Sequence, residues 1–159
     1  MNVVITALNR DLAPHFARLN REWIERLFAL EPADELILAN PQELIDAGGE
    51  VMFVLVDGEV VGTAGLQKLD ARTVELVKMA ITPAWQGRSL GGKLMQALIA
   101  MARTKGFARI YIETNASLTA SNHLYRKYGF KPTGQTASLH GYARADAFYE
   151  LQLQSTERS

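Results

Sequence analysis

Cysteine is absent from this chain of 159 residues, which excludes disulfides, thiolate metal sites and a cysteine nucleophile. An excess of charge of either sign is also absent, because 17 basic residues balance 17 acidic ones. The chain therefore lacks the excess of positive charge that is typical of proteins that bind nucleic acid or an anionic membrane. No apolar run approaches the ~20 residues of a membrane span, and the N-terminus lacks the pattern of a signal peptide. We expect no nucleic-acid or membrane partner, and a cytoplasmic location.

Internal repeats, low-complexity tracts and Pro/Gly/Ser-rich linkers are likewise absent. Hydrophobic residues make up 48% of the chain and charged residues 21%, which is typical of soluble globular proteins. The length fits one domain with a sizeable core. We therefore predict a single domain over residues 1–159, with the polar residues Ser155–Ser159 frayed.

Hydrophobic periodicity and turn residues predict an irregular order of strands and helices. The predicted strands are Val3–Ala7, Val51–Val56, Glu59–Gln67, Val74–Ile81, Arg109–Thr114, Lys131–Thr136 and Ala147–Leu153. The predicted helices are Asp11–Leu30, with Asp11 as N-cap, Gln42–Ala47, Leu90–Lys105 and Leu118–Tyr128. A doubly wound domain needs regular strand–helix alternation, which this order does not show. The order indicates a mixed sheet with helices on its faces.

The most informative stretch is a glycine-rich segment between the strand that ends at Ile81 and the helix that begins at Leu90. We call this segment the glycine loop: Gln86-Gly87-Arg88-Ser89-Leu90-Gly91-Gly92-Lys93. Glycines at a helix start expose backbone N–H groups, and the helix dipole adds a partial positive charge. Together these features favour an anion, so the loop predicts a site for a phosphorylated ligand.

A nucleotide-triphosphate P-loop is one interpretation, because Gly87, Gly92 and Lys93 have the spacing G-x-x-x-x-G-K. That motif continues with a serine or threonine that coordinates magnesium. Here the next residue is Leu94, on the apolar side of the predicted helix. The P-loop interpretation is therefore disfavoured.

A wider pattern, from Glu75 to Phe130, resembles the GNAT superfamily of acyl-CoA-dependent N-acyltransferases. Gln86-x-x-Ser89-x-Gly91 is similar to the family's loop motif, and Leu124-Tyr125-Arg126-Lys127-Tyr128-Gly129-Phe130 is similar to its second signature. Ser89 departs from the motif, which has glycine there. The resemblance implies an α/β (α+β mixed) fold with a central, mostly antiparallel mixed sheet flanked by helices on both faces. It leaves a homodimer open.

The resemblance also implies acetyl-CoA as co-substrate, with no metal, and assigns its binding residues. The implied pyrophosphate cradle is Gln86, Gly87, Arg88, Ser89, Leu90, Gly91, Gly92 and Lys93. The implied contacts to the pantetheine arm and the thioester carbonyl are Met79, Ala80, Ile81, Asn115 and Asn122. Other interpretations remain: Arg88 and Lys93 as solvated cations, Ser89 as a helix cap, and Asn115 as a turn residue.

Two residues are the catalytic candidates. Tyr125 resembles the family's general acid, which would protonate the departing thiolate; a core aromatic is the alternative. Glu75 is the candidate base, acting through water. Strand alternation predicts that it shares a face with Val77 and Met79, while the alternative is a strand-edge carboxylate paired with Lys78 or Arg72.

The three histidines, His15, His123 and His140, are scattered, and no carboxylate lies at metal-ligand spacing, so we expect no metal site. His140 falls in the segment Ser138–Asp146, which would border an acceptor pocket. The predicted acceptor region is rich in acidic residues: Glu25, Glu31, Asp34, Glu35, Glu43, Asp46 and Glu50. These either attract a cationic amine or form a solvated surface.

The predicted function is N-acetyl transfer from acetyl-CoA to a primary amine of a small molecule or peptide by direct attack. The alternative is a non-catalytic acyl-CoA-binding or sensing module.

Overall fold

The computed structural model describes residues 1–153 and contains one seven-stranded sheet in the order β1-β2-β3-β4-β5-β7-β6. The strands are β1 (Val3–Ala7), β2 (Glu50–Val56), β3 (Glu59–Lys68), β4 (Thr73–Ile81), β5 (Arg109–Thr114), β6 (Lys131–Pro132) and β7 (Ala147–Gln152). The helices are α1 (Ala13–Leu27), α2 (Pro32–Ala39), α3 (Gln42–Asp46), α4 (Leu90–Thr104) and α5 (Thr119–Lys127), with a 3-10 turn, η1 (Pro83–Trp85).

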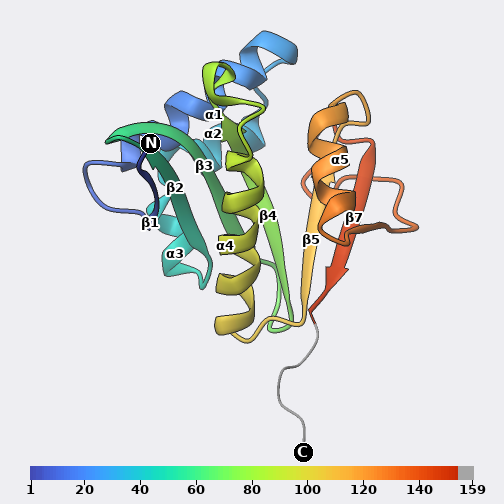
Figure 1. Cartoon of the computed structure of the whole chain (residues 1–159). Helices are drawn as coiled ribbons and strands as arrows, with labels where there is room; N and C mark the ends of the chain where they lie inside the picture. The colour runs from blue at the N-terminus through green and yellow to red at the C-terminus, as the bar shows by residue number, and fades with distance from the viewer. Residues whose placement is uncertain (154–159) are drawn as a thin grey trace, which may run out of the picture.

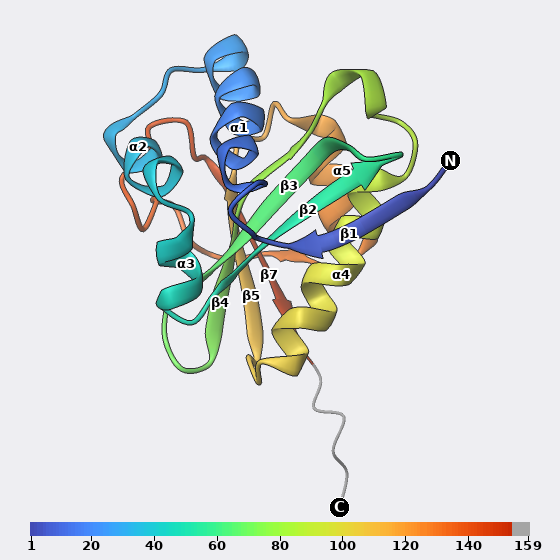
Figure 2. The same cartoon turned by 90° about the vertical axis from the view of Figure 1, so that its left-hand side faces the viewer.

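Every neighbouring strand pair is antiparallel except β4 and β5, which run parallel. Helices α1, α2 and α3 cover one face of the sheet, and α4 and α5 cover the other (Figures 1 and 2). Each face has its own apolar core, with Phe16 and Phe53 buried on the α1 side and Leu94 and Leu98 on the α4 side. The predicted fold class is confirmed.

The strands β4 and β5 pair over only part of their length. Their register runs from Thr73 opposite Arg109 to Leu76 opposite Ile112. Beyond Leu76 the two strands separate, as Figure 1 shows. The β5-facing edge of β4 thus has no strand partner after Leu76 among the described residues. An unpaired strand edge presents free backbone donors and acceptors.

A β-bulge interrupts β4 at Lys78, which has a φ of 54°. The β3–β4 register shifts beside it, since a bulge places an extra residue on one strand. The prediction that Glu75, Val77 and Met79 share one face is therefore wrong for Met79. Val77 packs into the core on the α1 side, whereas Met79 packs on the α4 side.

Helix α2 was not predicted, although its start carries a recognisable signal. Glu31 and Asp34 form a capping box, and Pro32 occupies the first helical turn, where its missing N–H costs nothing. The prediction of Asp11 as the cap of α1 is wrong. The N-cap is Leu12, whose N–H donates to the Asn9 side chain at 2.9 Å.

Two other predicted boundaries differ by three residues or more, and several differ by one or two. Helix α1 ends at Leu27 rather than Leu30. The strand predicted from Lys131 to Thr136 is limited to Lys131–Pro132. The predicted fraying of Ser155–Ser159 lies outside the described residues. Among residues 1–153, no helix combines the length and the apolar character needed to cross a bilayer.

Candidate active site

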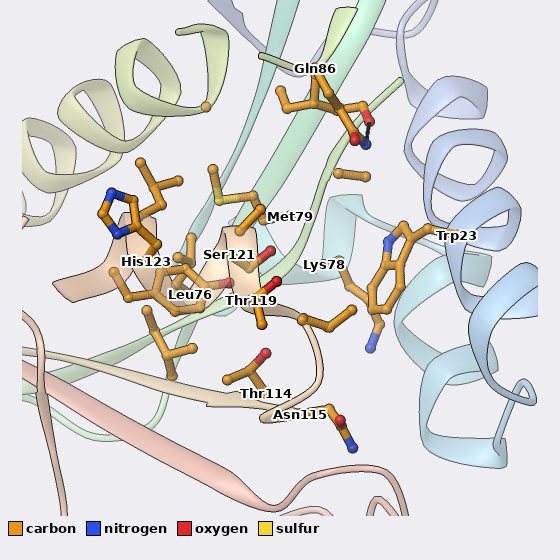
Figure 3. A pocket seen from close by; sticks show the side chains of 18 of the residues that line it. Trp23, Leu76, Lys78, Met79, Gln86, Thr114, Asn115, Thr119, Ser121 and His123 are labelled. Atoms are coloured by element: carbon orange, nitrogen blue, oxygen red, sulfur yellow. Dashed lines mark hydrogen bonds between the residues drawn. The ribbon is translucent and has the colours of Figure 1, made fainter. Parts of the chain in front are cut away.

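A cavity of about 560 Å³ opens where β4 and β5 separate. Figure 3 shows Gln86 at one end, Trp23 and Lys78 along one side, and His123 on the opposite side. The predicted site residues that line the cavity are Glu75, Met79, Ala80, Ile81, Gln86, Gly87, Ser89, Leu90, Gly91, Gly92, Asn115 and Tyr125. Arg88, Lys93 and Asn122 are not among the lining residues. Predicted site residues that are up to 50 positions apart in the sequence, from Glu75 to Tyr125, thus line the same cavity.

The glycine loop reaches the cavity through an unusual backbone at Ser89. This residue is the N-cap of α4 with a φ of 65°, and its side chain makes no capping hydrogen bond. The interpretation of Ser89 as the helix cap is therefore confirmed in position, although its side chain does not take part; its carbonyl accepts from the Lys93 N–H at 3.2 Å. Gln86 ties the loop to the end of β4, because its Nε2 donates to the Ile81 carbonyl at 2.8 Å.

Because a left-handed φ strains a residue with a Cβ, we expect the Ser89→Gly variant to unfold at a higher temperature. The relieved strain is about 1–2 kcal/mol, and the greater freedom of glycine in the unfolded chain offsets part of it. A net gain of about 0.5–1 kcal/mol raises the Tm by roughly 1–4 °C for a domain of this size. Thermal unfolding monitored by circular dichroism measures it.

The matched reverse change is Gly87→Ala. Gly87 has a φ of 77°, and a Cβ there would meet no atom within 4 Å, so only backbone strain opposes the methyl group. We expect the Tm of this variant to fall by a similar amount. A lower Tm for Ser89→Gly than for the wild type would contradict the inference that the backbone at Ser89 is strained.

The two cations of the loop are exposed. The Arg88 guanidinium lies over the Trp85 ring, 4.9 Å from its centroid, and Lys93 is not among the residues that line the cavity. Gly92 also contacts the second motif, Leu124–Phe130. A Cβ at Gly92 would lie 2.8 Å from the Tyr128 hydroxyl. The absence of a side chain at Gly92 lets the end of α5 approach the start of α4.

The two asparagines hold the loop before α5. Asn122 is buried, and its Nδ2 donates to the carbonyls of Asn115 and Leu118 at 3.0 and 2.7 Å. Asn115 Nδ2 donates to the Arg144 carbonyl at 2.7 Å, and its Oδ1 accepts from the Ser117 N–H. The amide donors of both residues are therefore engaged by the protein, which fits the turn interpretation of Asn115.

Tyr125 lies on α5 with its ring buried between two other aromatic rings. The Phe130 and Tyr149 centroids are 6.1 and 5.9 Å from it. Burial raises the pKa of the Tyr125 phenol to about 12, although hydrogen bonding to Ser121 opposes this shift. The phenol therefore keeps its proton at neutral pH and lines the cavity as a hydrogen-bond donor.

Glu75 is buried on β4, and its partner is not the one predicted. Its Oε1 lies 2.6 Å from Nε2 of His140, so pairing with Lys78 or Arg72 is not observed. Burial raises the pKa of the Glu75 carboxyl, and the contact with His140 opposes that rise. The same contact raises the pKa of the His140 imidazole.

A second carboxylate, Glu113 of β5, completes this cluster. Ligand atoms of Glu75, Glu113 and His140 lie within 4.8 Å of one another, a grouping that sequence spacing did not reveal. Glu113 accepts from the Tyr111 hydroxyl at 2.8 Å, and from the Ser138 hydroxyl and the Leu139 N–H at 2.6 Å each. These donors satisfy the carboxylate without a cation, so the cluster is a hydrogen-bonded network.

A buried ion cluster lies beside the cavity and contributes Lys78 and Arg144 to its lining. Asp34 of α2 is fully buried and accepts from Lys78 at 2.7 Å and from both terminal nitrogens of Arg144 at 2.5 and 2.8 Å. Burial alone would raise the pKa of the Asp34 carboxyl, but these cations lower it to about 2. Lys78 also donates to the Tyr142 hydroxyl at 3.0 Å. Sequence reasoning missed this cluster because its members are up to 110 positions apart.

Two of the acidic residues that were predicted to attract a cationic amine, Glu31 and Asp34, are already paired with other groups of the protein. Asp34 holds two cations, and Glu31 accepts from the Ala143 N–H at 3.0 Å and faces Arg144 at 3.5 Å. These contacts fasten α2 to the segment before β7.

Comparison with known proteins agrees with this geometry. Residues 15–130 match the model of the acetyltransferase (GNAT) family. The uncharacterized N-acetyltransferase YjgM of Escherichia coli K12 is 40% identical over 87 residues, which cover 53% of this chain and 52% of that protein. The match thus spans about half the length of that relative. N-alpha-acetyltransferase RimI of Mycobacterium tuberculosis H37Rv is 33% identical over 150 residues, covering 92% of this chain and 89% of that protein.

A solved structure shows the same fold. The structure of yncA from Salmonella typhimurium with its cofactor acetyl-CoA superposes with a TM-score of 0.79 at 24% identity, covering 100% of this chain and 98% of that one. The family model covers well over half of the chain, and its two signatures meet at the cavity. This chain belongs to the acetyltransferase (GNAT) family.

Proposed function

We propose that this chain is a single-domain N-acyltransferase that transfers the acetyl group of acetyl-CoA to a primary amine. The observation that carries the proposal is the cavity at the split between β4 and β5. A strand edge without a strand partner, an anion-binding loop and the side chains of Tyr125 and Glu75 all face this one space.

The residues that line the cavity support an acyl-CoA as its ligand. The pyrophosphate would lie on the backbone N–H groups of the glycine loop at the start of α4, where the helix dipole favours an anion. The pantetheine arm would pair with β4 near Met79, Ala80 and Ile81, whose β5-facing edge lacks a strand partner. A backbone N–H of Met79 or Ala80 would then stabilise the oxyanion of the reacting carbonyl. The acetyl-CoA in the Salmonella relative supports this choice of co-substrate.

The proposed chemistry is direct attack. The acceptor ammonium gives one proton to the ionised Glu75 carboxylate through a water, and the neutral amine attacks the thioester carbonyl. A new C–N bond forms, the C–S bond breaks, and the thiolate takes the phenolic proton of Tyr125. The extra proton that remains on the new amide nitrogen then passes through water to the Tyr125 phenolate, which leaves a neutral amide and restores the acid. Burial disfavours the charged form of the CoA thiol as it does that of the Tyr125 phenol. The pKa values of both groups therefore shift in the same direction, which keeps proton transfer between them feasible.

The proposed acceptor is a primary amine of a small molecule or a peptide, which enters beside Trp23 and Lys78. The mycobacterial relative is described as an N-alpha-acetyltransferase, which supports a peptide amine. The pairing of Glu31 and Asp34 with Arg144 argues against an acidic surface as the attractant.

Thermal unfolding with two ligands tests the co-substrate. Acetyl-CoA at about 100 times its Kd should stabilise the fold by about 2.7 kcal/mol, which raises the Tm by roughly 5–10 °C. ATP with magnesium should leave the Tm unchanged, because Leu94 replaces the metal ligand of a P-loop. A shift with ATP alone would overturn the proposal.

Release of free thiol from acetyl-CoA across a panel of amines then separates an enzyme from a sensing module. We expect amine-dependent release. Tight binding of acetyl-CoA with no release for any amine would favour the alternative, a non-catalytic acyl-CoA-binding protein.

A further inference from the structure

The contact between Glu75 and His140 joins the candidate base to a segment 65 positions away in the sequence. The Glu75 side chain is 3% exposed and the His140 side chain 22%. Glu75 lines the cavity, whereas His140 is not among the lining residues. The imidazole holds one carboxylate oxygen of Glu75, Oε1, and no side-chain hydrogen bond engages the other oxygen among residues 1–153.

The backbone around His140 is held in place. The His140 N–H donates to the Ser138 hydroxyl oxygen at 3.1 Å, and that hydroxyl donates to Glu113 at 2.6 Å. The Leu139 N–H donates to the same carboxylate. The ring edge of His140 also packs against Tyr142, with centroids 5.9 Å apart. A histidine on a surface loop is thus fastened to β5 from one side and to β4 from the other.

We propose that His140 is a positioning residue for acyl transfer: it orients the Glu75 carboxylate toward the cavity and sets the pH above which this carboxylate accepts the amine proton. This inference rests on the proposed function. It goes beyond that function because it assigns the pH dependence to a residue that does not touch the substrate.

The charges around the pair explain the direction of the effect. A protonated His140 stabilises the ionised form of Glu75 and makes it a weaker base, and a neutral His140 releases that constraint. The other groups facing the pair are Glu113 from β5, which raises the pKa of His140, and Lys78 from β4, which lowers it. Lys78 is itself compensated by Asp34 of α2. Glu75 has the largest influence and raises the pKa of His140 above its ordinary 6.5.

The first experiment uses His140→Gln, since a glutamine amide still donates to Glu75 but does not titrate. The dependence of kcat on pH is measured between about pH 5.5 and 9 with saturating acetyl-CoA and amine. For the wild-type protein we expect the acid-side midpoint above 6.5, because Glu75 and His140 titrate as a pair. In His140→Gln the acid-side limb reports the Glu75 carboxyl alone and its midpoint should fall, because the histidine that titrates above 6.5 is gone, while kcat at pH 8 stays within about threefold.

The matched control is His15→Gln, the same substitution on α1 at a histidine that bonds Arg18 rather than the cavity residues. Its pH profile should coincide with that of the wild type. A His140→Gln profile that also coincides with the wild type would overturn the positioning role.

A second measurement needs no catalysis. The pKa of the His140 ring is followed by NMR in the wild-type protein and in Glu75→Gln. We expect the pKa to fall in the variant because the carboxylate that raises it is gone; an unchanged value would refute the pairing. A protein that neither binds nor consumes acetyl-CoA would overturn the proposed function and the role of His140 in it, even if the NMR shift is found.

Discussion

Replacing Tyr125 with phenylalanine is expected to lower kcat by about a hundredfold, which is the lower range for loss of general acid catalysis. The affinity for acetyl-CoA should be nearly unchanged. Phenylalanine keeps the packing against Phe130 and Tyr149, so only the hydroxyl is removed. Because the pKa of Tyr125 is raised to about 12, the phenol is fully protonated and available to the thiolate throughout the physiological pH range.

Steady-state kinetics at saturating amine, with the Kd of acetyl-CoA measured by calorimetry, separates catalysis from binding. Tyr149→Phe is the matched control, because it removes a hydroxyl from the neighbouring ring, which bonds Arg126 and does not line the cavity. Its kcat should stay within about twofold of the wild type. A Tyr125→Phe variant with wild-type kcat would exclude the general acid role.

Substitution Asp34→Asn is expected to destabilise the fold by about 3–5 kcal/mol, the usual cost of breaking a buried ion pair from one side. Asp34 is fully buried between Lys78 and Arg144. Removal of its charge leaves two cations close together without their shared partner. The Tm should fall on the order of 10 °C, and urea unfolding gives the free energy directly.

The control lies one position further along the same helix. Glu35 pairs with Arg21 on the surface, where the two side chains are 50% and 39% exposed. Because water screens such a pair, Glu35→Gln should change the free energy of unfolding by less than about 1 kcal/mol. Equal effects of the two substitutions would contradict the importance of the buried cluster.

The same cluster predicts an acid dependence of stability. The pKa of Asp34 in the folded state, about 2, lies below the ordinary value of 3.8. The unfolded chain therefore binds a proton more readily, and the stabilisation present above about pH 4 is lost as the pH falls toward 2. The Asp34→Asn variant should lack this component of acid sensitivity.

Local patterns predicted most of the elements because their signals are local. The run from Val51 to Val56 and the turn Asp57-Gly58 specify β2 and the β2–β3 hairpin, and both φ angles in that turn are positive, as a type I′ turn requires. Strand β5 was predicted without error over Arg109–Thr114. Helix α2 was missed because two local signals conflict there. Proline usually interrupts a helix, and the apolar pattern of Pro32–Ala39 is too short to outweigh it.

The sequence predicted the individual segments of the site but not the contacts between them. The glycine loop was identified from its glycines between a strand and a helix, and the segment from Leu124 to Phe130 from its resemblance to a family signature, whereas the packing of Tyr128 over Gly92 is a tertiary contact. Strand periodicity placed Met79 on the wrong face, since a bulge at Lys78 changes the alternation. A bulge has no reliable signature when the residue with positive φ is a lysine.

The sequence by itself determined the class of fold and the family, because hydrophobic periodicity indicates a mixed sheet and two motifs resemble those of the GNAT family. It also predicted an anion site at the glycine loop. Only the tertiary structure decided the partners of the charged groups. Glu75 meets His140, and Asp34 meets Lys78 and Arg144. A charged side chain buried by folding must find its counter-charge wherever the chain brings one within reach, and that distance in space has no counterpart in sequence separation.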